Sequence, residues 1–210
     1  AKKKKADLLE LGREFTFKIL KSDLKGVSFD YLGKNKVYKN LETTLIGEHQ
    51  AKNGATAVAI IEALILLGYK IEEKAIRDGL KRVNWLGRLE ILQDNPKVLI
   101  DAAHNVDGAL TLSKALTDLF TYENLVLVIG MLADKEREKV LSIIAPLADK
   151  LIVTKPNSPR AEGWEKIGEF AKDYISRPEV IPSVEEAVLK GLKETGERDL
   201  LCITGSIYMI

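Results

Sequence analysis

The sequence predicts an α/β protein whose larger part is a mostly parallel sheet with helices on both faces. From about residue 85 to 210, short apolar runs alternate with segments of helical periodicity, which is typical of parallel strands buried on both faces. From residue 1 to about 84, the apolar runs alternate with polar residues and two helical segments follow, which predicts antiparallel strands plus helices. We therefore expect two domains, residues 1–84 and 85–210.

The first domain is expected to open with the end of a helix, residues 1–12, which stops at Gly12. Three strands and two helices should follow. The strands are expected at 14–20, 26–32 and 37–47, and the helices at 53–69 and 71–83. The helix over 53–69 is apolar nearly all round, so we expect it to be buried.

The second domain should alternate strand and helix to its end. One or two strands are expected in 88–102, and further strands at 124–132, 149–155, 179–183 and 199–206. Helices are expected between them at 105–120, 134–148, 163–175 and 183–196. This order predicts an open sheet of Rossmann-like topology.

Composition narrows the classes of function. The 210 residues carry a net charge of +1, whereas bulk binding to nucleic acid needs an excess of Lys and Arg; the basic run at 2–5 is short and more typical of a solvated surface. Cys202 is the single cysteine and lies in an apolar run, which indicates a buried thiol in a reducing compartment. No apolar run reaches the length of a membrane span, and no signal peptide is found, so we expect a cytoplasmic protein.

Polar residues follow the predicted parallel strands, at the edge where such sheets bind ligands. The first of these loops contains Asp101 and His104, which lie about one helical turn apart at a predicted helix N-terminus, and this favours binding of phosphate or carboxylate. Structural roles are open for others: Asn105 and Asp134 could cap helices, and Ser206 could belong to a turn.

Two segments earlier in the sequence also contain candidate functional residues. His49 lies between a strand and a helix that Gln50 or Asn53 could cap. Arg88 follows a glycine at the domain boundary, where a guanidinium could bind phosphate in an interdomain cleft. One imidazole per site is a poor zinc signature, so no metal site is predicted. Neither glycine-rich nucleotide-binding motif, the phosphate loop or G-x-G-x-x-G, occurs.

Six motifs, in this order and spacing, resemble one family. They are GEHQAKNGATA, WLGRLE, VLIDAAHN, GMLADKE, SPRA and ITGSIY. From about residue 14 to the end, the sequence resembles the C-terminal half of folylpolyglutamate synthase/dihydrofolate synthase, a member of the Mur ligase superfamily. The family usually has glycine where Ala102 stands and alanine where Gly54 stands; neither change removes a functional side chain.

The resemblance implies an ATP-dependent ligase. Residues 1–84 would be the last part of the central ATPase domain and residues 85–210 the C-terminal Rossmann-like domain, with ATP between them. The enzyme would join glutamate to the γ-carboxyl of folate through an acyl phosphate, with dihydropteroate as a second candidate acceptor. The cofactors would be ATP and Mg²⁺, with the phosphate loop and most magnesium ligands upstream of residue 1. The chain would then be a fragment that is inactive alone, monomeric, and without nucleic-acid or membrane partners.

The same resemblance assigns the site residues. ATP would be bound by Asn53 at the adenine, Arg88 at the phosphates and Asp101 at the ribose. His104 would be catalytic and would face the phosphate and glutamate region, and Ser206 would help to hold glutamate. Two alternatives stay open. One is a cell-wall amino-acid ligase of the Mur type, against which the HQ..N and DAAHN motifs speak. The other is a non-catalytic Rossmann-like binding module.

Overall fold

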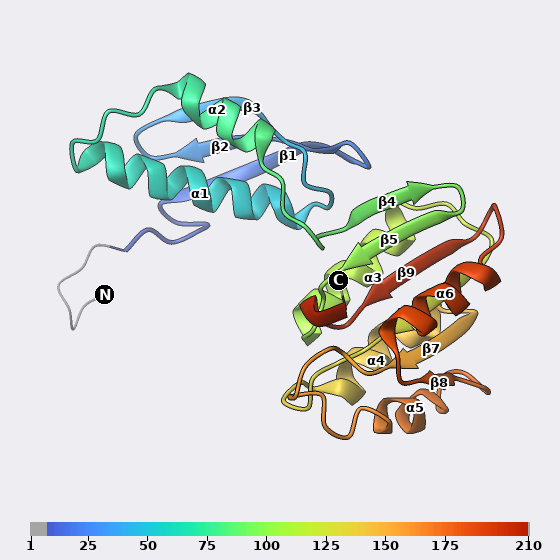
Figure 1. The fold of residues 1–210 in the computed structure, drawn as a ribbon. Helices are drawn as coiled ribbons and strands as arrows, with labels where there is room; N and C mark the ends of the chain where they lie inside the picture. The colour runs from blue at the N-terminus through green and yellow to red at the C-terminus, as the bar shows by residue number, and fades with distance from the viewer. Residues whose placement is uncertain (1–7, 210) are drawn as a thin grey trace. The chain divides into compact units, whose positions relative to one another are not determined.

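The structure is a computed structural model that describes residues 8–209, and it divides into two compact units (Figure 1). The first unit ends at Trp85 and the second begins at Leu86. Of the helix expected over residues 1–12, the first seven residues lie outside the described part of the chain. The described part is not helical: residues 8–10 have no regular structure and a turn follows.

The first unit is a three-stranded antiparallel sheet with two helices. Its strands β1 (Phe15–Asp23), β2 (Gly26–Gly33) and β3 (Val37–Thr43) pair in chain order, and α1 (His49–Leu66) and α2 (Glu73–Arg82) pack on them (Figure 1). Aromatic side chains from the sheet and small residues from α1 form the core. Gly54 is part of this contact, because a Cβ there would lie 2.7 Å from Cζ of Phe29. The close fit accounts for glycine at this position.

The prediction that α1 is buried on all sides was wrong. Ile60, Leu66 and Leu67 are 57%, 70% and 77% exposed, because the sheet covers only the face that carries residues such as Ala51, Ala55 and Val58. The helix also begins earlier than expected, at His49, with Glu48 as its N-cap residue.

The second unit confirms the predicted α/β class. Its strands are β4 (Glu90–Asp94), β5 (Lys97–Asp101), β6 (Leu125–Ile129), β7 (Lys150–Thr154), β8 (Glu179–Ile181) and β9 (Leu200–Thr204). They form one sheet in the order β4-β5-β9-β6-β7-β8, in which only β4 is antiparallel to its neighbour. The helices are α3 (Val106–Asp118), α4 (Arg137–Ile144), α5 (Lys166–Ala171) and α6 (Val184–Glu194), with short 3-10 turns η2 (Ala145–Leu147) and η3 (Ile207–Met209).

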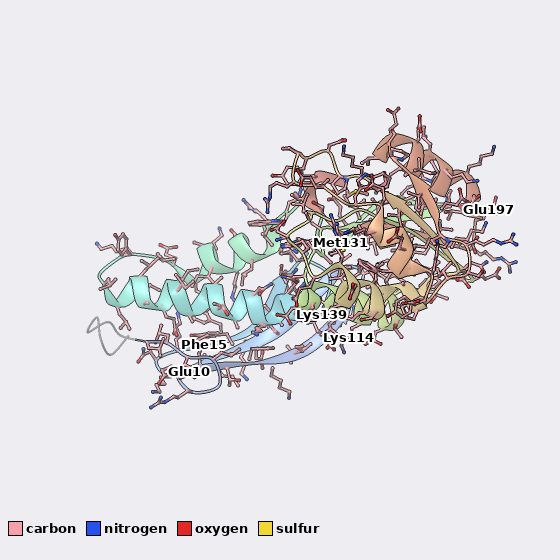
Figure 2. All side chains as sticks on the ribbon, turned by 90° about the horizontal axis from the view of Figure 1, so that it is seen from below. Glu10, Phe15, Lys114, Met131, Lys139 and Glu197 are labelled. Carbon is pink, nitrogen blue, oxygen red and sulfur yellow. The ribbon has the colours of Figure 1, made fainter. Side chains whose placement is uncertain are left out.

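The last crossover determines where the loops meet. The chain passes outward from β5 through β6 and β7 to β8, and α6 then returns it to β9, between β5 and β6. Helix α3 packs on α4, whereas α6 packs on β6 and β7 from the opposite face of the sheet (Figure 1). Apolar residues fill both sides, and Met131, labelled in Figure 2, is fully buried where the loop after β6 begins. The ends of β5, β9 and β6 are therefore neighbours.

Candidate functional site

The carboxyl ends of three adjacent strands lie in register. Thr204 at the end of β9 pairs with Asp101 of β5 on one side and with Ile129 of β6 on the other. The backbones that leave β9 and β6 touch, because a Cβ on Gly205 would lie only 2.4 Å from the carbonyl oxygen of Gly130. Gly205 also has a φ of +103°, a conformation that glycine adopts without steric cost. The edge is therefore compact and leaves little room for substitution.

Asp101 is the buried charge at this edge. The residue is 7% exposed, and each carboxylate oxygen accepts a backbone N–H, Oδ2 from Leu89 at 2.9 Å and Oδ1 from Ala103 at 2.8 Å. Burial raises the pKa of Asp101, while these two hydrogen bonds and the positive charges of Arg88 and His104 act to lower it. Arg88 and His104 thus lie in the electrostatic range of one carboxylate.

Arg88 is presented by a constrained turn. Gly87 and Leu89 have φ angles of +69° and +48°, and both are buried while Arg88 is exposed. A leucine in the left-handed region costs about 1–3 kcal/mol and persists only where its surroundings enforce it. The turn is held by hydrogen bonds from Ala102 N to Gly87 O at 2.8 Å and from Gly87 N to Oε2 of Glu90 at 2.8 Å. Gly87 therefore belongs to a turn whose backbone is held in place and that carries the exposed Arg88 side chain.

His104 lies in the loop between β5 and α3. Its Nδ1 is 2.9 Å from the carbonyl oxygen of Ala102, and because a carbonyl can only accept, Nδ1 carries the proton. The neutral ring therefore keeps Nε2 as its acceptor. Asn105 follows as the N-cap residue of α3, as predicted, and its Oδ1 accepts from Gly108 N at 2.8 Å. The cap fixes the backbone from which the imidazole projects.

Ser206 lies in the short segment between β9 and η3. The residue is 3% exposed, and its Oγ accepts a hydrogen bond from Tyr208 N at 3.2 Å in the turn that forms η3. Two residues earlier, the hydroxyl of Thr204 is buried and has no hydrogen-bond partner among the described residues. Ser206 is near Asp101 through the β5–β9 pairing, so the structure brings it to the same edge as Arg88 and His104.

The first residue of α4 is buried between the loops after β6 and β7, and sequence reasoning missed it. Arg137 is 9% exposed and donates from its guanidinium to four backbone carbonyls, those of Met131 (2.9 Å), Leu132 (3.0 Å), Glu162 (3.0 Å) and Gly163 (2.7 Å). Burial lowers its pKa. In the sequence Arg137 stands in the charged run DKEREK, where nothing separates it from exposed charges.

Beside Arg137 lies a cavity of about 600 Å³ lined by charged residues of both signs. Its walls include Lys135, Glu136, Glu138, Lys139, Glu162 and Lys166. Asp134 does not cap the following helix as expected, because α4 begins after Glu136. Instead its carboxylate pairs with Arg160 at 2.7 Å and links the loops after β6 and β7.

Asn53 belongs to the first unit. It lies inside the first turns of α1, so neither Asn53 nor Gln50 caps the helix. Its Nδ2 donates to Oε1 of Gln50 at 3.0 Å, and Nε2 of Gln50 donates to Nε2 of His49 at 2.9 Å. Asn53 is exposed, and within residues 8–209 no partner for its Oδ1 is found. This chain of bonds holds the amide of the exposed Asn53 near the start of α1.

Residues 8–209 lack two features. No group of three or more His, Cys, Asp or Glu side chains in residues 8–209 could hold a metal ion. Over the same range, no helix combines the length and apolar character needed to cross a membrane.

Comparisons with known proteins find one family. Residues 87–207 match the family model described as Mur ligase, glutamate ligase domain. The dihydrofolate synthase/folylpolyglutamate synthase of Bacillus subtilis is 29% identical over 191 residues, which are 88% of this chain and 43% of that protein. The folylpolyglutamate synthase of Mycobacterium tuberculosis, solved with ADP, superposes with a TM-score of 0.83 at 30% identity, over 95% of this chain and 46% of that chain.

A cell-wall enzyme also matches. The UDP-N-acetylmuramoyl-L-alanyl-D-glutamate–2,6-diaminopimelate ligase of Aquifex aeolicus is 31% identical over 207 residues, 95% of this chain and 42% of that protein. The chain thus spans less than half the length of each of these relatives. Because the family model covers more than half of the sequence, the chain belongs to the Mur ligase family, in which it matches the C-terminal half of folylpolyglutamate synthases.

Proposed function

We propose that the chain is the C-terminal half of a cytoplasmic, monomeric ligase that uses ATP to join glutamate to folate through an acyl phosphate. One observation carries the proposal: Arg88 and His104 lie around the same buried carboxylate at the carboxyl edge of a parallel sheet. A guanidinium and an imidazole at such an edge suit a reaction in which a phosphoryl group is transferred and then displaced. The first unit would be the last part of the ATPase domain and the second the C-terminal domain.

The residues that would bind ATP have suitable chemistry. Arg88 is exposed on a turn with a constrained backbone, so its guanidinium is accessible for hydrogen bonds with phosphate oxygens. Asn53 offers an amide that Gln50 already orients, and an amide can both donate to and accept from an adenine edge. The solved relative from Mycobacterium tuberculosis binds ADP, which supports nucleotide binding by this chain.

His104 and Ser206 would act on the amino-acid side of the reaction. With Nδ1 donating to Ala102 O, Nε2 of His104 is the nitrogen that can accept a proton from an incoming ammonium group or contact the reacting phosphate. Ser206 would help to hold glutamate. Its hydroxyl now accepts from Tyr208 N, so it can still donate to a carboxylate.

Magnesium would offset the charge of the ATP phosphates when it is bound. Within residues 8–209 no cluster of carboxylates and imidazoles suits a metal, so we propose that its ligands come mostly from the rest of the protein. The relatives are more than twice as long as the aligned region. For that reason we also propose that this 210-residue chain has no ligase activity alone.

The test is ligation by the full-length protein with ATP, glutamate and either folate or dihydropteroate as acceptor. The expected result is glutamylated product and ADP with at least one of these acceptors, and no turnover by the 210-residue chain alone. The cell-wall ligase is the second candidate, because the Aquifex relative is 31% identical over 207 residues.

The same assay separates the candidates when a UDP-linked muramyl dipeptide and 2,6-diaminopimelate are supplied. Product from this pair alone would replace the folate assignment with the cell-wall one. Binding of ADP without turnover of any acceptor by the full-length protein would instead indicate a non-catalytic module.

A further inference from the structure

We propose that Arg137 is a positioning residue for the incoming glutamate, because its buried guanidinium clamps the two loops that adjoin the Ser206 segment. This inference rests on the proposed function, in which Ser206 helps to hold glutamate. Arg137 stands one residue beyond the motif GMLADKE, so it is not among the residues that the family resemblance selects.

The four acceptors of Arg137 all lie in loops. Its guanidinium donates to the carbonyl oxygens of Met131 and Leu132, which follow β6, and to those of Glu162 and Gly163, which lie between β7 and α5. Arginine can bind on both sides at once because its five N–H groups form a planar fork. The clamp therefore fixes the two loops relative to each other without hydrogen bonding to a strand.

Both loops are also tied to the segment that contains Ser206. In the loop after β7, Asn157 N donates to the carbonyl oxygen of Tyr208 at 3.3 Å, and the N–H of the same Tyr208 donates to Ser206 Oγ. At the start of the loop after β6, a Cβ on Gly130 would lie 2.5 Å from Sδ of Met209. A displacement of either loop therefore reaches the turn on which Ser206 lies.

The buried guanidinium is a stronger link than the contacts that accompany it. The loops are also joined by Ala133 N, which donates to Arg160 O at 2.8 Å, and by the ion pair of Asp134 with Arg160. That pair is about half exposed on each side, and such pairs contribute little. Arg137 is 9% exposed, and moving the loops apart would leave its charge and its carbonyl acceptors buried without partners.

The clamp is separated from the residue proposed to contact the ATP phosphates. The turn that carries Arg88 is bonded from the end of β5, where Ala102 N donates to Gly87 O. Arg137 acts on the loops after β6 and β7, and β9 lies between β5 and β6. Loss of the clamp should therefore disturb glutamate binding and leave the phosphate contact in place.

The first measurement is steady-state ligation by the full-length protein at varied glutamate and at varied ATP. Arg137→Lys keeps the charge but removes the planar fork, so we expect KM for glutamate to rise about tenfold or more while KM for ATP stays within about twofold. Arg198→Lys is the matched control, because Arg198 is an exposed partner of Glu123, and it should change neither KM. An equal rise of both KM values in Arg137→Lys, or a lower kcat with both KM values unchanged, would overturn the proposal.

Amide hydrogen exchange in the same proteins needs no ligand and no turnover, so it separates this inference from the proposed function. Arg137→Lys should speed exchange about tenfold or more at Ala133 and Asn157, whose N–H groups link the loops to Arg160 O and Tyr208 O, with the amides of β6 and β9 unchanged. Unchanged exchange at both amides would overturn the proposal even if the enzyme proves to be a folate ligase. Faster exchange without wild-type turnover would instead reject the proposed function, and the glutamate role of Arg137 with it.

Discussion

Two buried charges of opposite sign hold the loops at the carboxyl edge of the second unit. Asp101 accepts two backbone N–H groups and ties the Arg88 turn to the loop that carries His104. Arg137 donates to four backbone carbonyls and ties the loop after β6 to the loop after β7. Both solve the same problem, which is that irregular backbone buried beside a sheet must find hydrogen-bond partners. They differ in how many partners they have and in how they respond to pH.

The largest effect on stability should come from replacing Arg137. Arg137→Met leaves four carbonyl groups without their donor, so we expect the free energy of unfolding of the 210-residue chain to fall by about 2–4 kcal/mol. Urea unfolding measures it. Arg198→Met is the control, because Arg198 is an exposed partner of Glu123 and should change stability by less than about 1 kcal/mol. Equal losses in the two variants would show that Arg137 has no special role.

The next largest effect is the pH dependence of the stability that Asp101 contributes. Burial raises the pKa of Asp101 in the folded state, so the folded protein holds this proton more tightly than the unfolded chain does. The part of the stability that depends on this pKa shift is therefore greatest below about pH 4 and falls as the pH rises through the raised pKa, while the two backbone hydrogen bonds remain. The difference in unfolding free energy between wild type and Asp101→Asn should fall over that range.

The pKa of Asp199 is shifted in the opposite direction to that of Asp101. Hydrogen bonds from the Asn124 side chain and from Gly196 N lower its pKa, so its contribution is present above about pH 4 and is lost as the pH falls through the lowered value. The difference in unfolding free energy between wild type and Asp199→Asn should therefore decrease as the pH is lowered. Over the same change in pH, the difference between wild type and Asp101→Asn should increase. The same slope for both pairs would contradict the assignment of Asp101 as a carboxylate destabilised by burial.

The smallest effect concerns the cap beside His104. Asn105→Ala removes the acceptor for Gly108 N and should cost about 1 kcal/mol. Ser183→Ala removes the corresponding cap of α6, whose Oγ accepts from Glu186 N at 3.3 Å, and should cost a similar amount. Only Asn105→Ala should also lower ligation by the full-length enzyme, because it loosens the loop that carries His104. Equal activity in the two variants would show that the cap has no part in orienting the imidazole.

The contrast between Asp101 and Arg137 also shows how far sequence reasoning reaches. Alternation of apolar runs and helices predicts the α/β class, and the rule that ligands bind at the carboxyl edge of parallel strands selects Asp101, His104 and Ser206. Arg137 cannot be selected in this way, because its burial depends on a loop about 25 residues later that folds over it. A charge becomes structural only through contacts that are distant in the chain.

Other features depend equally on tertiary structure. The insertion of β9 between β5 and β6 brings Ser206 close to Asp101, and strand periodicity contains no information about strand order. The left-handed Leu89 is not predictable either, since leucine rarely adopts that conformation. The exposed face of α1 was missed because an apolar helix predicts burial whether or not enough sheet is present to cover it.

The most direct test of the account compares glutamate ligation by the full-length protein with ligation by its Arg88→Ala and His104→Ala variants. Arg198→Ala serves as the surface control. The account predicts folate-dependent product from wild type and control, and a loss of kcat/KM of about 10²–10³-fold in each site variant. Wild-type rates in both site variants would contradict it.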